Sequence, residues 1–254
     1  MDPERTLMNV EITDLTRRFG RTQAVSGVDL RIGPGVFGLL GPNGAGKTSL
    51  LRMMATVVPP SSGTLRLLGR DPGAPGPRRE IRRSLGYLPQ NLGYYPGFTV
   101  VEFVEYFALL KEMPPKRIPA AVANAVERVG LGDKAKARLR TLSGGMLRRA
   151  GIAQAIVNEP ELLLFDEPTA GLDPEQRMTF RDLLRDLGQR ASVVVSTHLV
   201  EDVGAACGTV ALMHQGRIAF HGTPDELTAR GEGHGTGDAP LERGYSAVLL
   251  EARS

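Results

Sequence analysis

The chain has 254 residues and a formal net charge of +3, which suits one large domain and excludes several classes of protein. A single cysteine, Cys207, rules out an intrachain disulfide and favours a reducing compartment. No apolar run approaches the length that spans a bilayer, and the first ten residues lack the apolar core of a signal peptide, so we expect a soluble chain. No dense basic block is present, so no nucleic acid is expected as a partner.

The first elements have the pattern of antiparallel strands. Val10 and Ile12 alternate with polar neighbours, and Val28, Leu30 and Ile32 do the same. This alternation is typical of strands with one buried face. We therefore expect a small antiparallel β-subdomain at the start of the chain.

A glycine-rich stretch between an apolar run, residues 36–40, and a helical pattern, residues 47–57, matches the phosphate-loop motif G-x-x-x-x-G-K-[ST]. Its glycines let backbone N–H groups curl around a phosphate, and the following helix adds its positive N-terminal end. Lys47 would reach the β- and γ-phosphates, and the Thr48 hydroxyl would bind Mg²⁺. A chance glycine turn is the alternative, but the fixed positions and the flanks favour nucleotide binding. The residues expected to bind the nucleotide here are Gly41, Pro42, Asn43, Gly44, Ala45, Gly46, Lys47, Thr48 and Ser49.

Phe19 lies in a turn upstream of this loop. An isolated aromatic residue could simply cover a small core. With a nucleotide site downstream, it could instead stack on adenine, a contact worth about 1 kcal/mol. Residue chemistry alone leaves both interpretations open.

The segment that follows the first helix alternates between breaks and short strands. Residues 59–63 break the helix, residues 64–68 have the pattern of a short strand, and residues 71–77 are rich in Gly and Pro and predict a surface loop. Residues 85–90 predict a strand that ends in Pro-Gln. A single glutamine, Gln90, is a weak signal in isolation.

Residues 91–158 have a helical character and no strand pattern, which predicts an inserted helical subdomain. One helix is expected to begin behind Thr99 as its N-cap, and a second to cover residues 119–129. A third begins at Ser143 and carries one apolar stripe, formed by Met146, Ala150, Ala153 and Val157. The start of this third helix is either an ordinary cap or a second anion site, built from a helix N-terminus, a serine hydroxyl and two glycines.

Two further strands end in polar residues. The apolar run 162–165 predicts a buried parallel strand, and Asp166 and Glu167 follow it. Asp166 is expected to hold Mg²⁺ through its water shell, and Glu167 to orient and deprotonate the attacking water. The alternative is that both carboxylates turn to solvent. Residues 192–198 repeat the pattern, and because strand ends converge on one crevice in an open α/β sheet, His198 is expected to contact the γ-phosphate. Asp173 caps the helix between these strands.

The last predicted elements are a hairpin, with strands at residues 210–214 and 217–221, and a short helix capped by Thr223. Only about two dozen residues follow residue 228. They are expected to form a short C-terminal tail.

The order and spacing of four motifs, GPNGAGKT, LSGGM, LLLFDEP and STH, resemble those of the ATP-binding subunit of ABC transporters. The likeness covers the chain from about residue 8 to residue 228. It implies an α/β fold with a P-loop NTPase (RecA-like) core and a mostly parallel sheet, an N-terminal antiparallel β-subdomain and an inserted helical subdomain. The implied domains are an ABC ATPase domain at 1–228, with its helical signature subdomain at 91–158, and a short tail at 229–254.

The resemblance also implies roles for individual residues. Phe19 matches the adenine-stacking aromatic, although tyrosine is commoner there, and Gln90 matches the glutamine that touches Mg²⁺ or the attacking water. Asp173 matches the loop that crosses the dimer interface, and His198 matches the switch histidine. Met146 departs from the glutamine common at the end of the signature, and its place on the apolar stripe suggests that it packs inward. The signature itself is matched by Ser143, Gly144 and Gly145.

In this family the signature of one subunit closes over the ATP held by the phosphate loop of another. The resemblance therefore implies an ATPase that forms a head-to-tail dimer, with itself or with a paralogous ATPase, around two ATP molecules and their Mg²⁺. The residues implied in catalysis are Lys47, Gln90, Glu167 and His198.

The segment 91–100 looks like the corresponding stretch in ATPases of small bacterial ABC-2-type exporters, which work with a separate transmembrane permease. Tyr94, Tyr95 and Phe98 are candidates for the groove that receives the permease, although core packing is the default for each. The short tail leaves no room for the regulatory domain of many sugar importers, which favours export. We therefore expect a cytoplasmic protein, peripheral on the inner face of the cell membrane through its permease.

Two alternatives belong to other functional classes. A soluble ABC-type ATPase that remodels ribosomes or nucleic acid usually carries two cassettes or a long coiled-coil insertion, and this sequence has neither. A switch that binds ATP without hydrolysing it is disfavoured by Glu167 and His198.

Overall fold

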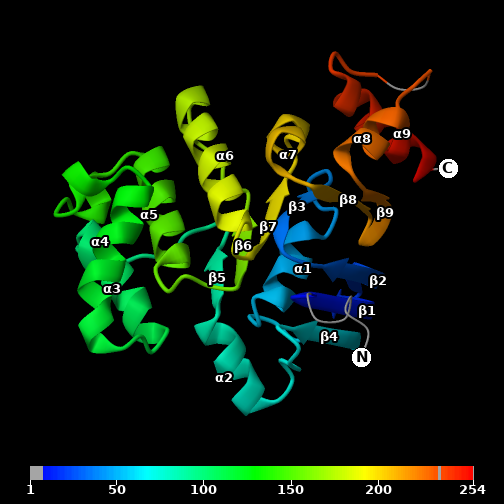
Figure 1. Cartoon of the computed structure of the whole chain (residues 1–254). Helices are drawn as coiled ribbons and strands as arrows, with labels where there is room; N and C mark the ends of the chain where they lie inside the picture. Colours follow the sequence, from blue (N-terminus) through cyan, green and yellow to red (C-terminus); the bar gives the residue numbers. More distant parts are fainter. Residues whose placement is uncertain (1–7, 234–235, 254) are drawn as a thin grey trace.

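The computed structural model describes residues 8–233 and 236–253, which form two β-sheets flanked by helices (Figure 1). The strands are β1 (Val10–Phe19), β2 (Thr22–Ile32), β3 (Gly35–Leu40), β4 (Ser62–Leu67), β5 (Leu85–Leu88), β6 (Leu162–Asp166), β7 (Ser192–Thr197), β8 (Thr209–His214) and β9 (Arg217–Gly222). The helices are α1 (Lys47–Met54), α2 (Pro75–Arg83), α3 (Val100–Leu110), α4 (Ile118–Arg128), α5 (Gly144–Ile156), α6 (Pro174–Gly188), α7 (Val200–Ala206), α8 (Pro224–Ala229) and α9 (Pro240–Glu251). Residues 1–7 of the expected ATPase domain, and residues 234, 235 and 254 of the expected tail, lie outside the described residues.

The smaller sheet is antiparallel, with the strand order β2-β1-β4. Val10 lies opposite Ile32, and Ile12 lies opposite Leu30. All four side chains are buried, because the alternating pattern puts them on the face that packs on the rest of the domain. The predicted antiparallel strands are confirmed.

The larger sheet has the order β5-β6-β7-β3-β8-β9, in which β9 is antiparallel and the other strands are parallel. Its central strands β6 and β7 are buried at every position. Strands covered on both faces are continuously apolar, which is the pattern of the two runs in the sequence. The mostly parallel sheet, the antiparallel sheet and the helical region together confirm the predicted fold class.

One face of the larger sheet packs on the antiparallel sheet and α1, and the other packs on helices. Helices α3, α4 and α5, drawn in green, stand together beside the β5 edge (Figure 1). Their apolar side chains form one cluster with Phe165 of β6 and Val193 of β7. The helical region therefore shares its core with the sheet.

The prediction of a single apolar stripe on α5 is wrong in its extent. Residues 150–157 are buried all round, because α5 packs against α3, α4 and β5. Met146 lies half-buried against the same core, which agrees with the inward packing predicted for it.

Several helix boundaries follow from their caps. Thr99 begins α3 with a capping box, in which its hydroxyl accepts from the N–H of Glu102 at 3.2 Å and the Glu102 carboxylate accepts from the Thr99 N–H at 2.7 Å. Thr223 begins α8 in the same way. The expected loop at 71–77 is wrong at its end, because Pro75 begins α2; proline is well suited to a first helical position.

The segment expected to be a tail contains a helix, α9, which packs against α7 and α8. Val248 and Leu249 of α9 are buried with Leu227 of α8 and Phe220 of β9. Within the described residues, no helix combines the length and the apolar character needed to cross a bilayer.

Candidate active site

The strand order brings three strand ends to one edge of the larger sheet. Strands β6, β7 and β3 are neighbours, with Asp166 opposite Ser196 and Leu40 opposite Thr197. The phosphate loop follows β3, Glu167 follows β6, and His198 follows β7. Ligands of open α/β sheets bind at such carboxyl ends.

The phosphate loop lines a cavity of about 270 Å³. Two of its glycines are required by geometry: Gly41 and Gly46 have φ of 152° and 104°, where other residues are strained. A Cβ on Gly41 would lie 2.3 Å from the Met213 carbonyl oxygen, and one on Gly46 would lie 2.3 Å from that of Ala24. The loop contributes residues 43–49 to the lining, and Ala24, Gln90 and Glu167 complete it. The structure therefore brings the predicted loop, glutamine and glutamate together.

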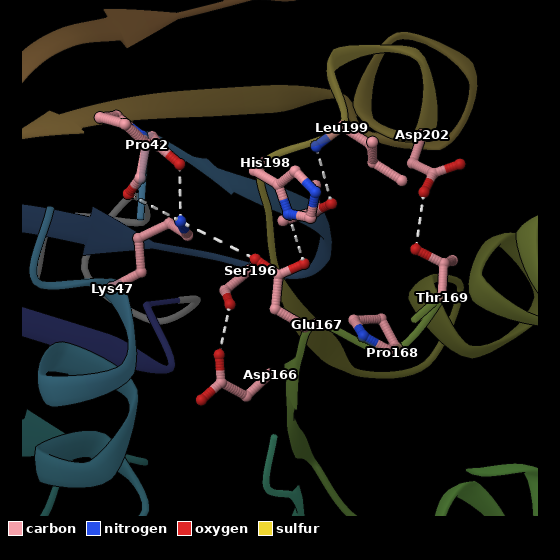
Figure 2. Close-up of polar contacts among 12 residues, drawn as sticks. Pro42, Lys47, Asp166, Glu167, Pro168, Thr169, Ser196, His198, Leu199 and Asp202 are labelled. Atoms are coloured by element: carbon pink, nitrogen blue, oxygen red, sulfur yellow. Dashed lines mark hydrogen bonds and ion pairs between the residues drawn. The ribbon is translucent and has the colours of Figure 1, made fainter. Parts of the chain in front are cut away.

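Lys47 is buried at the first position of α1. Its ammonium donates to the carbonyl oxygens of Gly41 at 2.6 Å and Pro42 at 3.2 Å, and it lies 3.8 Å from Glu167 Oε1 (Figure 2). Burial lowers the pKa of Lys47 from its ordinary value, and the negative charges of Glu167 and Asp166 oppose that shift. A phosphate in the cavity would supply the charge partner that the two carbonyls only partly replace.

Asp166 is fully buried at the end of β6, so the alternative in which it turns to solvent is wrong. Its Oδ1 accepts from the Ser196 hydroxyl at 2.6 Å and from the Thr48 hydroxyl at 3.3 Å. Its Oδ2 is buried and has no hydrogen-bond partner among the described residues. A buried carboxylate oxygen left without a partner, beside a threonine hydroxyl, fits the hard oxygen ligands of Mg²⁺ and its bound water.

Glu167 is also buried, which again contradicts the solvent-facing alternative. Its Oε2 lies 3.0 Å from Nδ1 of the exposed His198, and its Oε1 faces Lys47 (Figure 2). Its backbone has φ of 50°, a left-handed conformation that is uncommon outside glycine. Its carboxylate thus lies between an ammonium and an imidazole at the rim of the cavity.

The predicted residues Ser143, Gly144, Gly145 and Asp173 do not line this cavity. Ser143 is exposed at the start of α5, where its hydroxyl accepts from the Met146 N–H at 3.3 Å; Gly144 is exposed beside it, and Gly145 is buried. Asp173 is the N-cap of α6 and accepts from the Gln176 N–H at 2.8 Å.

Phe19 is 43% exposed, so it does not cover a core. The guanidinium carbon of Arg17 lies 4.5 Å from the centroid of its ring. The Arg17 guanidinium also donates to the Pro59 carbonyl oxygen at 2.8 Å. One face of the ring is therefore held by a cation, a contact that the sequence did not indicate.

Sequence reasoning missed several residues that support the site. The Ser196 hydroxyl donates to Asp166 and holds its carboxylate. The only sign of this role in the sequence is a polar residue inside an apolar strand. Thr169, after Glu167, donates to Asp202 on α7 at 2.8 Å (Figure 2). Asp202 also accepts from Arg181 of α6 at 2.8 Å. This network joins the segment after Glu167 to the helix that follows His198. A further missed residue is Arg148, a buried arginine on α5.

A groove of about 480 Å³ lies near Gln90, between β5, α3 and the segment that follows α1. Leu92, Phe107 and Leu110 are among its apolar lining residues, and Lys111 is among its basic ones. The three aromatic residues predicted for such a groove do not line it: Tyr94 and Tyr95 are exposed, and Phe98 is half-buried beside the core of the helical region.

Comparison with known proteins includes two relatives that match most of this chain and about seven tenths of their own length. Nod factor export ATP-binding protein I of Paraburkholderia xenovorans is 38% identical over 224 residues, which cover 87% of this chain and 72% of that protein. YxlF of Bacillus subtilis, named as an uncharacterized ABC transporter ATP-binding protein, is 35% identical over 219 residues, which cover 86% of this chain and 72% of YxlF.

Two solved structures share the fold. CbiO1 from Clostridium perfringens, described as part of the ABC transporter complex CbiONQ, has a TM-score of 0.76 and 28% identity and covers 88% of this chain and 91% of its own. An ATP-binding subunit of an ABC transporter has a TM-score of 0.82 and 22% identity, with 98% of this chain and 100% of that chain covered.

The family model described as ABC transporter matches residues 25–170, a span that contains the phosphate loop, Gln90, the Ser143 helix and both buried carboxylates. The structure adds the cavity that the loop forms with Gln90 and Glu167. The chain belongs to the ABC transporter family, as one of the ATP-binding subunits that hydrolyse ATP.

Proposed function

We propose that two copies of this chain, or this chain and a paralogous ATPase, close head to tail around two ATP molecules and thereby drive a separate transmembrane permease. One observation carries the proposal: Ser143, exposed at the start of α5, does not line the phosphate-loop cavity of its own chain. A helix N-terminus capped by serine and followed by an exposed glycine is half of an anion site. Head-to-tail pairing would join the two halves around each ATP.

In the proposed complex the phosphate loop wraps the phosphates with the backbone N–H groups of residues 43–49. Lys47 exchanges its two carbonyl partners for oxygens of the β- and γ-phosphates. Thr48, Gln90 and Asp166 would hold Mg²⁺, which neutralises charge on the phosphate oxygens when it is bound. The partnerless Oδ2 of Asp166 supports this assignment.

Hydrolysis in this proposal depends on Glu167. It accepts a proton from water while the water oxygen bonds to the γ-phosphorus and the bond to the ADP oxygen breaks, giving ADP and phosphate. The contact of Glu167 with His198 at 3.0 Å supports a joint role, in which the exposed imidazole orients the carboxylate and reaches the γ-phosphate. Lys47 and the Ser143 helix of the other copy stabilise the charge that develops on the transferring group.

The remaining site residues act at the edges of the bound nucleotide. Phe19 would stack on adenine, with the Arg17 guanidinium behind its ring. Asp173 would lie at the interface between the two copies. Ser143, Gly144 and Gly145 would close on the ATP of the other copy.

Export is the direction that we propose, since a relative at 38% identity is named as an export ATP-binding protein. The groove beside Gln90 would receive a cytoplasmic helix of the permease, because its apolar lining is open next to the catalytic loop. The chain would then lie on the inner face of the cell membrane, held there by the permease.

The first experiment replaces Glu167 by Gln. The amide keeps the shape of the side chain but accepts no proton, so ATP binding should survive and an ATP-bound dimer should accumulate. Size-exclusion chromatography with multi-angle scattering measures the dimer, and a phosphate-release assay measures turnover. Turnover at the wild-type rate would refute the role of Glu167.

A second experiment replaces Ser143 by Arg at the exposed start of α5. It should abolish hydrolysis while the monomer keeps its affinity for ATP. Loss of monomer binding would show that Ser143 belongs to the same site as Lys47.

The permease contact is tested by Leu110→Glu, which introduces a charge into the groove. Met178→Glu on α6 is the matched control, because Leu110 and Met178 are exposed to 58% and 64% and only Leu110 lines the groove. Leu110→Glu alone should lose co-purification with the co-expressed permease and keep basal ATPase activity. Equal co-purification of both variants would contradict the assigned groove.

A further inference from the structure

Arg148 is a buried arginine on α5, on the same helix that begins at Ser143. Every hydrogen bond that the structure gives its guanidinium goes to a backbone carbonyl oxygen. Nη1 donates to the carbonyl oxygens of Pro89 at 2.8 Å and Gln90 at 3.0 Å. Nη2 donates to those of Asp166 and of Glu167, the latter at 2.6 Å, and Nε donates to that of Pro168 at 3.4 Å.

These acceptors belong to two segments, one that follows β5 and one at the end of β6, and each segment contributes a residue to the lining of the phosphate-loop cavity. One segment carries Gln90 and the other carries Glu167, and both residues line the cavity. The planar fork of an arginine presents its donors in a fixed geometry, so the two segments are held at a fixed separation. A lysine has its three donors on one nitrogen and lacks this planar fork, so it could not reproduce all of these contacts.

The carbonyl of Glu167 needs such a contact because of its backbone conformation. Its left-handed φ of 50° is strained for a residue with a side chain and persists only when neighbours enforce it. Arg148 holds the Glu167 carbonyl, and the Ser196 carbonyl accepts from the Glu167 N–H at 3.0 Å. Together these bonds direct the carboxylate toward Lys47 and His198.

We propose that Arg148 is a positioning residue for Glu167 and Gln90 of its own chain, carried on the helix that closes on the other ATP. The inference rests on the proposed two-copy function. An α-helix moves as a rigid body over a few turns. When the Ser143 end of α5 shifts on the ATP of the other copy, the Arg148 guanidinium and the two segments that it binds therefore shift as well. Hydrolysis by Glu167 of one copy is then coupled to the closing of that copy's Ser143 helix on the other ATP.

The test compares Arg148→Gln and Arg148→Lys with the same changes at Arg149. Arg149 is the matched control, since its guanidinium also donates to two carbonyls, of Val129 at 3.1 Å and Gly130 at 2.9 Å, but both lie in the helical region. Both Arg148 variants should lower kcat by about 10- to 100-fold, as loss of a supporting contact does, with KM for ATP unchanged. The Arg149 variants should retain kcat. Equal kcat in the Arg148 and Arg149 variants would overturn the proposal.

A mixed dimer separates positioning from damage to α5. One copy carries Glu167→Gln, so hydrolysis takes place only at the Glu167 of the other copy. Arg148→Gln in the copy with the intact Glu167 should slow hydrolysis by the same factor. Arg148→Gln in the Glu167→Gln copy, whose Ser143 helix serves the active site, should not. The proposal would be overturned if the second arrangement slowed hydrolysis, or if neither arrangement slowed it.

Two measurements keep the outcomes distinct. The melting temperature of each variant identifies any that fails to fold. If Arg148→Gln does not fold, Arg148→Lys, which keeps the charge, takes its place in the mixed dimers. If Glu167→Gln alone traps no dimer, the two-copy function fails, whereas a kcat loss confined to the Arg148 variants still supports positioning within one chain.

Discussion

Ser196→Ala removes the 2.6 Å hydrogen bond from the Ser196 hydroxyl to Asp166 Oδ1, between two residues that have no exposed surface. A hydrogen bond to a charged group contributes about 1.5–3 kcal/mol. The carboxylate oxygen would keep only the longer contact to Thr48, at 3.3 Å. We therefore expect the free energy of unfolding to fall by about 2 kcal/mol, which for a chain of this size lowers Tm by about 4–8 °C.

The same change should weaken the response to Mg²⁺. With Ser196 gone, one anchor of the Asp166 carboxylate is lost, and loss of such a supporting contact lowers metal affinity by about 10- to 100-fold. The Mg²⁺ concentration that gives half-maximal ATPase activity should rise accordingly. It is measured by titrating Mg²⁺ at a fixed, saturating concentration of ATP.

Ser192→Ala is the matched control for this prediction. Ser192 lies on the same strand, also without exposed surface, but at the opposite end from the nucleotide, where its hydroxyl donates to the Gly33 carbonyl and accepts from Asn9 Nδ2 at 3.0 Å. It should lower Tm without moving the Mg²⁺ titration. The reasoning would be refuted if Ser196→Ala left the Mg²⁺ titration in place, or if Ser192→Ala moved it equally.

Three other predictions concern binding, folding and pH. Phe19→Ala should raise the Kd for ATP about 5- to 150-fold, since base stacking contributes about 1–3 kcal/mol, and leave tripolyphosphate binding unchanged; an equal loss for both ligands would argue against stacking. Thr99→Ala removes the capping box of α3 and should lower the free energy of unfolding by about 0.5–2 kcal/mol in urea titrations with KM for ATP unchanged; an unaltered urea midpoint would contradict the cap. Burial lowers the pKa of Lys111 from 10.5 to about 8. Between these values the unfolded chain binds more protons than the folded one, so the stability of the wild type should rise with pH relative to Lys111→Met, and parallel pH curves would count against the shift.

The parts of the site that the sequence predicts are those whose chemistry is contiguous. The phosphate loop carries its own motif, and the two buried strands are predicted from apolar runs that are followed by Asp166 and His198. The caps Thr99 and Ser143 stand at the turn where a helical pattern begins, so local rules suffice.

The parts that the sequence does not predict depend on register and on distance in three dimensions. Ser196 meets Asp166 because β6 and β7 pair with those residues opposite each other, and no local pattern contains that register. Arg148 reaches carbonyls 59 and 20 residues away, at Pro89 and Pro168. Helix α9 has 12 residues, too few for a stable isolated helix, and lies after a glycine-rich segment, so it is stabilised mainly by packing on α7 and α8.

The phosphate loop is assembled from segments that are far apart in the chain. Gly41 and Gly46 lie against the backbones of Met213 and Ala24, and the Ala45 carbonyl accepts from the Gly216 N–H at 2.9 Å. A chain that stops before β8 therefore contains the complete motif but lacks one wall that shapes it. Because a ligand stabilises only the conformation that binds it, ATP would select finished molecules over partly folded ones, and nucleotide retention could serve as a check on complete synthesis.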